Sequence, residues 1–367
     1  MASTTTRSGG SRWLHRFAVF AAGATLALLW VGGLVTSHGV GMAVPDWPTS
    51  YGYNMFFFPI HQWWAVGGIF YEHSHRLLAS GIGFLTILLA VWAWLDERRW
   101  LRRLAVGALA AVILQGVLGG LRVTQMKDEI GIFHATLAQL FFALLGAIAL
   151  FTSRWWEQAG SAKMAIYGAR PFRYLFGTVT GLILCQLVLG ATMRHQHAGL
   201  AIPDFPRAYG AAWPATDPAS VAKYNQARGE VVALNPITRG GVLLQMTHRI
   251  LAFGLLASVA WLASSTRRRF GASSVLARLA LLWLALVLVQ AGLGAATIWT
   301  NKAADVATAH VAVGALCLML GTLGTLVAAR LSPALAADLS PGLPPMETVR
   351  RSTAASGAEV AVSQAIL

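Results

Sequence analysis

Long apolar runs separated by short charged segments are the dominant pattern along the chain. A helix needs roughly 20 apolar residues to cross a bilayer, and eight runs approach or exceed that length. The first run follows several arginines, as in a signal peptide, but it is too long for a cleaved signal and is interpreted as the first span. The predicted spans are residues 17–36, 77–95, 104–121, 130–153, 174–193, 250–266, 279–301 and 306–329. The pattern predicts an all-α polytopic membrane protein.

The amino-acid composition also indicates a protein that lies in a lipid bilayer. Hydrophobic residues make up 56% of the 367 residues and charged residues only 11%, too few to cover the surface of a soluble protein of this length. The net charge of +14 could suggest nucleic acid. However, the basic residues form short clusters between the apolar runs, so we expect no nucleic-acid partner.

The distribution of basic residues predicts the orientation. Arginines and lysines crowd the second, fourth and sixth connections, whereas residues 37–71 contain neither. By the positive-inside rule, both termini are expected to be cytoplasmic, with odd-numbered connections facing outward.

An internal repeat divides the chain. Residues 41–52 and 199–210 are identical at seven of twelve positions, at a constant offset of 158. Similar pairs follow at 72–79 and 245–252, and at 115–119 and 290–294. The repeat predicts two pseudo-symmetric four-helix bundles with the same topology. The expected segments are a cytoplasmic N-terminal segment (1–16), a first unit (17–153), a cytoplasmic linker (154–173), a second unit (174–330) that includes an outer loop (194–243), and a disordered cytoplasmic tail (331–367).

Four histidines occupy repeated positions near the outer ends of spans. His75 and His134 lie about four residues into spans two and four, and His248 and His310 take the matching places in the second unit. The uncharged cores of spans two and six, given above, start after His75 and His248 because an arginine sits near the start of each span. At 1.5 Å per residue, the two members of a pair lie at the same depth, roughly 6 Å below the outer helix ends. Ionisable residues within a membrane are costly and usually functional. Two imidazoles at one depth can hold a haem between them, whereas zinc needs three or four ligands.

The two units differ beside these histidines. Glu72 lies three residues before His75, on the same helix face, and its counterpart is Gln245. A carboxylate near the outer membrane edge can exchange protons during oxidation of a bound group. This asymmetry favours the first unit as the reactive site. The alternative interpretation is a helix-start acid or a partner of Arg76.

Other polar residues have weaker assignments. Arg76 and Arg249 follow the paired histidines and could bind haem propionates or reach the lipid headgroups. Asp46 and Asp204 are expected to shape the outer loops. The two cysteines, Cys185 and Cys317, are expected to be core residues. The remaining histidines, residues 15, 38, 61, 73, 195 and 197, are expected to be solvated or interfacial.

Together these motifs resemble the haem A synthase family. The resemblance rests on the repeated Pro-Asp-aromatic-Pro loops, on Glu72-His-Ser-His75-Arg and Thr247-His248-Arg, and on His134 and His310, and it covers roughly residues 13–330. It implies an oxidoreductase of the bacterial inner membrane that acts on a CH group, converting the C8 methyl of haem O to the formyl of haem A by successive hydroxylations. It implies Glu72 as the catalytic carboxylate, His75 and His134 as ligands of the substrate haem, and His248 and His310 as ligands of a haem b. Some members carry paired outer-loop cysteines, which this chain lacks.

Two other functions remain open from the sequence. A dihaem cytochrome b that oxidises quinol would need no difference between Glu72 and Gln245. A haem transporter or chaperone would exchange both haems without converting them. Supply of haem O by haem O synthase, an electron partner of unknown identity and a homo-oligomer are the further partners considered.

Overall fold

The computed structural model describes residues 12–65, 67–96, 98–159, 166–227 and 235–332. Within these ranges the protein is built from helices and loops, with only isolated bridges between Ser50 and Tyr53 and between Ala208 and Ala211. Eight helices are long and apolar enough to cross a membrane, which confirms the predicted fold class. They are α1 (Arg12–Ser37), α2 (Ile69–Trp94), α3 (Arg99–Gln125), α4 (Asp128–Phe151), α6 (Arg170–His195), α8 (Arg239–Phe270), α9 (Val275–Trp299) and α10 (Ala304–Leu331).

The helices extend beyond the predicted apolar cores at several ends. Helix α2 begins at Ile69 and α8 at Arg239, eight and eleven residues before the uncharged cores predicted to start at 77 and 250. Both extensions contain polar residues that are buried by neighbouring segments, among them Glu72 and Gln245. Hydropathy alone therefore places the start of these helices too late, because burial against protein substitutes for an apolar side chain.

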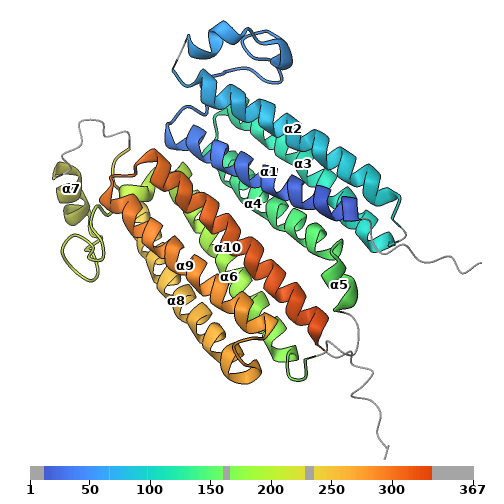
Figure 1. Cartoon of the computed structure of the whole chain (residues 1–367). Coiled ribbons are helices and arrows are strands. Elements are labelled where there is room, and N and C mark those ends of the chain that lie inside the picture. The colour runs from blue at the N-terminus through green and yellow to red at the C-terminus, as the bar shows by residue number, and fades with distance from the viewer. Residues whose placement is uncertain (1–11, 66, 97, 160–165, 228–234, 333–367) are drawn as a thin grey trace, which may run out of the picture.

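Short helices lie in the connections. The loop between α1 and α2 contains the 3₁₀ turns η1 (Met55–Phe57) and η2 (Ile60–Trp64), and α7 (Pro218–Gln226) precedes α8. In Figure 1 the loop between α1 and α2 and helix α7 lie at the same end of the molecule. A further short helix, α5 (Arg154–Gln158), follows α4 within the predicted linker. The predicted disordered tail falls outside the described residues, apart from its first two.

Helix contacts fall into two groups of four. Helices α1, α2, α3 and α4 contact one another around a closed ring, and so do α6, α8, α9 and α10. Figure 1 shows the two groups side by side, with α1 and α4 facing α10 and α6. This grouping is compatible with the two bundles that the repeat predicts.

Small residues bring the two groups together. On α1, a Cβ added to Gly33 would lie 2.8 Å from Thr308 of α10, and on α4 a Cβ added to Gly146 would lie 2.8 Å from Met319 of α10. Such close approach is typical of helix packing in membranes. A hydrogen bond of 3.0 Å between the hydroxyls of Ser37 and Thr308 adds a polar contact across the same interface.

The two cysteines have different surroundings. Cys317 is buried in the core of the second group, as expected, but Cys185 is exposed on α6. The core prediction for Cys185 is wrong because an apolar span has a lipid-facing side as well as a packed side, and the run of apolar residues does not distinguish them.

Candidate functional site

The structure brings the repeated histidines together in two pairs. His75, His134 and His310 are each the seventh residue of their helices, α2, α4 and α10, while His248 is the tenth of α8. In each bundle the two imidazoles lie close enough for their charges to interact, His75 with His134 and His248 with His310. Each pair therefore joins two helices of one bundle near its outer end.

A glycine of a neighbouring helix lies against each of the four imidazoles. Gly32 of α1 faces His75, and Gly119 of α3 faces His134. A Cβ added to these glycines would lie 2.9 and 3.3 Å from the Cε1 atom of the ring. In the second bundle, the corresponding distances are 3.4 Å from Gly190 to His248 and 3.1 Å from Gly294 to His310. A side chain at Gly32, Gly119 or Gly294 would press on the ring, whereas the distance at Gly190 is an ordinary van der Waals contact. The glycines thus allow each imidazole to lie close to the neighbouring helix.

A glutamine lies one turn before three of these glycines and contacts one of the paired histidines. The side-chain amides of Gln115 and Gln186 donate to the backbone carbonyls of His134 and His248, at 3.0 and 2.9 Å. The backbone carbonyl of Gln115 lies near the His134 ring, and that of Gln290 lies near the His310 ring. These approaches fall short of full hydrogen-bond geometry, and the Nδ1 atoms of all four paired histidines are buried without a partner among the described residues.

The donor set suits a haem. Within the described ranges no three His, Cys, Asp or Glu side chains come together as a metal site, so each site offers two imidazoles. Haem brings four nitrogen ligands of its own and leaves two axial positions, which a pair of imidazoles can fill. The buried nitrogen without a partner is Nδ1 in each ring, and a ring that carries its proton on Nδ1 has Nε2 as its ligand atom.

Glu72 and Gln245 occupy matching positions and bind matching loop atoms. The Glu72 carboxylate accepts a 2.8 Å hydrogen bond from the backbone N–H of Val44, and Gln245 accepts one of 2.6 Å from Ile202. Glu72 also forms a 2.7 Å ion pair with Arg76. The Gln245 amide instead donates to the carbonyls of Gly199 and Ile202. Both side chains anchor the outer loop, and they differ in charge.

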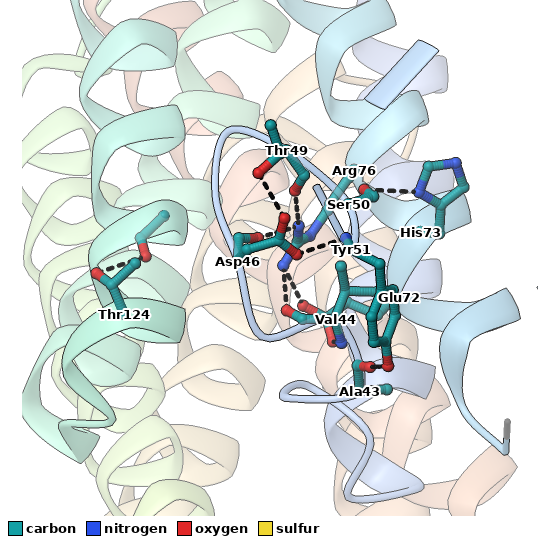
Figure 2. A network of polar contacts seen from close by, with 11 residues as sticks. Ala43, Val44, Asp46, Thr49, Ser50, Tyr51, Glu72, His73, Arg76 and Thr124 are labelled. Atoms are coloured by element: carbon teal, nitrogen blue, oxygen red, sulfur yellow. Dashed lines mark hydrogen bonds and ion pairs between the residues drawn. The ribbon is translucent and has the colours of Figure 1, made fainter. Parts of the chain in front are cut away.

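Arg76 and Arg249 use their guanidinium groups on the same loops. Figure 2 shows Arg76 surrounded by the loop that carries Val44, Asp46 and Thr49, whose carbonyls accept its hydrogen bonds at 2.7, 2.7 and 3.1 Å. Arg249 likewise donates to three loop carbonyls, those of Ile202, Asp204 and Arg207. Their main contacts are thus with backbone, and the predicted contact with haem propionates stays a prediction.

Asp46 and Asp204 shape these loops, as their position predicted. Asp46 accepts hydrogen bonds from the backbone N–H groups of Tyr51 and Gly52, and Asp204 accepts the matching pair from Tyr209 and Gly210. Burial alone would raise the pKa of Asp46, but hydrogen bonds from Gly52, Thr49 and Tyr51 outweigh it and lower the pKa. The ionised carboxylate is therefore the form that the loop holds.

Two histidines differ from the expectation of solvated or interfacial positions. His73 is buried, with its Nδ1 atom 3.2 Å from the Ser50 hydroxyl and its ring against Phe58 and Trp63. His195 is buried at the end of α6, where a Cβ added to Gly131 would lie 2.5 Å from its ring. The loop 38–68 and helix α4 cover these side chains, a tertiary effect that hydropathy does not contain. His38, His61 and His197 are exposed.

Sequence reasoning missed several residues around the histidine pairs. Gly32, Gly190 and Gly294 had no assignment from the sequence, and neither had Arg122 or Arg194. A signal was available, since Gly32 and Gly190 share the offset of 158 that relates the two loops. For Arg122 the signal was a difference between the two halves. The alignment that pairs Gln115 with Gln290 also pairs Arg122 with Thr297, so the charge is present in the first half alone at this position. Aligning the two halves at every position would have shown both features.

Comparison with known proteins identifies relatives along most of the chain. The sequence profile of the cytochrome oxidase assembly protein family matches residues 15–322. A haem A synthase of Geobacillus kaustophilus is 28% identical over 298 residues, covering 79% of this chain and 84% of the relative. One of a Chelativorans species is 32% identical over 265 residues, covering 70% and 68%. One of Methylorubrum populi is 25% identical over 363 residues, covering 90% and 88%. The matched range includes all four paired histidines.

Proposed function

Because this chain belongs to the cytochrome oxidase assembly protein family, within its haem A synthases, we propose that it oxidises the C8 methyl group of haem O to the formyl group of haem A by successive hydroxylations. The coarser statement follows from the family: the protein is a multi-pass membrane enzyme of haem A biosynthesis. The proposed oxidation of the C8 methyl group needs a binding site for haem O, a second redox group and a residue that accepts protons.

The repeated histidine pairs carry this proposal. Each pair combines two imidazoles on facing helices with a glycine against each ring, which is what two axial ligands of a flat macrocycle require. In the proposed assignment, His75 and His134 hold haem O as substrate, and His248 and His310 hold a haem b. A haem b in the second bundle would supply one-electron transfer to or from the first site.

The surroundings of the rings would keep the iron-binding nitrogen free. A ring that points Nδ1–H toward a backbone carbonyl carries its proton there, which leaves Nε2 as the ligand atom. The carbonyls of Gln115 and Gln290 lie near the His134 and His310 rings and would accept an Nδ1–H that turned toward them. The glycines would then prevent the rings from turning away.

Glu72 is the proposed proton acceptor. Each carboxylate oxygen has two lone pairs, and each accepts one protein hydrogen bond, from Arg76 or from Val44. Each oxygen can therefore still accept a proton or a further hydrogen bond. Gln245 has its amide hydrogens on two carbonyls and carries no charge to neutralise. The first bundle alone thus has an acid–base group at this position, which supports placing the oxidation there.

The proposed setting is the bacterial inner membrane with both termini cytoplasmic. Arg98, Arg102 and the arginines at 267–269 lie at the ends of helices opposite to the loops that carry Asp46 and Asp204, and basic residues favour the cytoplasmic side. Both histidine pairs would then lie near the outer surface.

The test is conversion of haem O by the full chain. The protein is expressed with a supply of haem O, purified, and its pigments are extracted and separated. The wild type should yield haem A together with haem B. Glu72→Gln should keep bound haem but accumulate haem O, because the amide at 245 shows that this group can still accept the loop N–H. Glu129→Gln, a change at an exposed position of α4, is the control and should convert normally.

Other pigment patterns would support the other functions. Haem B alone at both sites of the wild type would indicate a dihaem cytochrome b. Bound haem O that exchanges freely and is never converted would indicate a haem transporter. Normal haem A formation by Glu72→Gln would refute the role proposed for the carboxylate.

A further inference from the structure

A partly buried arginine with no acidic partner lies beside the first histidine pair. Arg122 occupies the last turn of α3, one turn beyond Gly119. Its charge interacts with both His75 and His134. Its guanidinium packs against the outer loop, where a Cβ added to Gly41 would lie 3.1 Å from Nη2. The guanidinium is thus held between the loop and the candidate haem site.

The protein itself does not neutralise this charge. The two acids close enough to interact with Arg122 are Glu72 and Asp128. Glu72 is already ion-paired with Arg76 at 2.7 Å, and Asp128 is exposed at the start of α4. No hydrogen bond or ion pair of the Arg122 side chain is found in the part of the chain that the structure describes. A charge placed at membrane depth without a partner is costly, so the position favours an anion brought by a ligand.

A second arginine increases the positive charge nearby. Arg194, at the end of α6, donates to the Gly33 carbonyl at 2.6 Å and to the Ser37 hydroxyl at 2.7 Å. Its charge interacts with that of Arg122, and both interact with the buried His195. Arg194 holds α6 against α1, and it makes the space around Arg122 more favourable still for an anion.

Only the first bundle has this feature. The counterpart of Arg122 is Thr297. The other arginines near the paired histidines already have acceptors. Arg76 and Arg249 donate to three loop carbonyls each, and Arg194, whose charge also reaches His310, donates to Gly33 and Ser37. Arg122, one turn beyond the glycine that lies against His134, is therefore the arginine near the first pair that has no acceptor among the described residues.

We propose that Arg122 binds a propionate carboxylate of the haem held by His75 and His134. This inference rests on the proposed function and adds to it. A guanidinium pairs with a carboxylate through two parallel hydrogen bonds, and propionates are the anionic groups of this macrocycle. The axial histidines leave the ring free to rotate about the line that joins them. A fixed propionate removes that freedom, so Arg122 would decide which edge of the ring, and hence which methyl group, faces Glu72.

The test uses a probe whose two propionates are esterified and therefore uncharged. Full-length protein carrying His248→Ala and His310→Ala, so that only the first site can load, is titrated with haemin and with haemin dimethyl ester while the Soret band is followed. Hydrogen bonds to charged groups correspond to roughly 10- to 100-fold in affinity. With Arg122 present, haemin should bind more tightly than the ester by about that factor. Arg122→Gln should weaken haemin binding by a similar factor and remove the difference, and Arg122→Lys should retain part of it.

Each outcome has a distinct meaning. Arg103→Gln, an exposed arginine of the same helix, is the matched control and should behave as the parent. Equal binding of haemin and its ester by the parent protein would overturn the inference without any further variant, and so would a preference for haemin that persists in Arg122→Gln. If the parent binds neither compound although His75 and His134 are intact, the proposed haem site itself is wrong.

Discussion

The contact between Gly32 and His75 allows the candidate haem site to be tested with a single methyl group. In Gly32→Ala the new Cβ would lie 2.9 Å from the Cε1 atom of His75. Carbon atoms in good contact are about 3.5–4.0 Å apart, so the ring would have to retreat by roughly 0.6–1.1 Å. Metal–ligand distances tolerate about 0.2 Å. The displacement is therefore several times larger than an axial bond can absorb.

The assay is the spin state of the bound haem. Two axial imidazoles give a six-coordinate, low-spin iron, and loss of one gives a high-spin form with a shifted visible spectrum. Gly32→Ala should convert the first site to the high-spin form. Gly23→Ala on the same helix is the control, because a Cβ there meets nothing within 4 Å. Alanine is the better helix former by up to about 1 kcal/mol, so the control should be as stable as the wild type or more stable.

The other glycines turn this test into a series. The added Cβ would lie 3.1 Å from the ring at Gly294, 3.3 Å at Gly119 and 3.4 Å at Gly190. The loss of low-spin haem should therefore decrease in the order Gly32, Gly294, Gly119, Gly190. A low-spin spectrum in Gly32→Ala, or an equal effect of Gly23→Ala, would refute the reasoning that these glycines position the ligands.

Three further predictions concern the outer loops. Gly120→Ala would collide with the indole of Trp47, so overpacking should cost about 1–3 kcal/mol and lower the thermal midpoint, whereas Gly116→Ala, with open space around it, should not. Arg249→Ala removes hydrogen bonds to three loop carbonyls and should make the loop around Asp204 more sensitive to limited proteolysis; unchanged cleavage would contradict that role. The pKa of Asp46 in the folded protein is lower than its ordinary 3.8. Its carboxylate should therefore stabilise the loop fully above pH 3.8, and this stabilisation should be lost as the pH falls through the lower pKa of the folded state. In an acid-proteolysis assay, Asp46→Asn should abolish this pH dependence of loop cleavage.

The sequence was sufficient to predict the eight spans and to place the four repeated histidines on them, although hydropathy placed the starts of α2 and α8 too late. Hydropathy identifies a span because burial in lipid demands about 20 apolar residues in succession. A fixed offset identifies equivalent positions without any knowledge of packing. His75 and His134 could therefore be assigned to one level of one bundle before their helices were seen in space, and the family resemblance is confirmed by the comparisons.

The remaining features depend on how neighbouring helices are rotated against one another. Whether Gly32 faces His75 or lipid is a property of two helices together, and the pattern of one span does not contain it. The same holds for His195, which is buried by α4, and for Cys185, which is exposed. Arg76 illustrates a second limit. Its position after a predicted haem ligand suggested either a propionate or the lipid headgroups as partner, while its hydrogen bonds go to a loop that folds back over the helix.

The last spanning helix has a consequence for biogenesis. Helix α10 packs against α1 and α4 as well as against its own bundle, and half of the most apolar window of both α4 and α10 is buried, compared with a third or less in the other spans. Until α10 has left the ribosome and entered the membrane, the inner flank of the N-terminal bundle lacks its main protein neighbour, because α6 packs less extensively against this bundle, mainly on α4. Insertion of haem into the first bundle should therefore follow completion of translation, and a nascent chain that ends before residue 304 should be a substrate for membrane proteases.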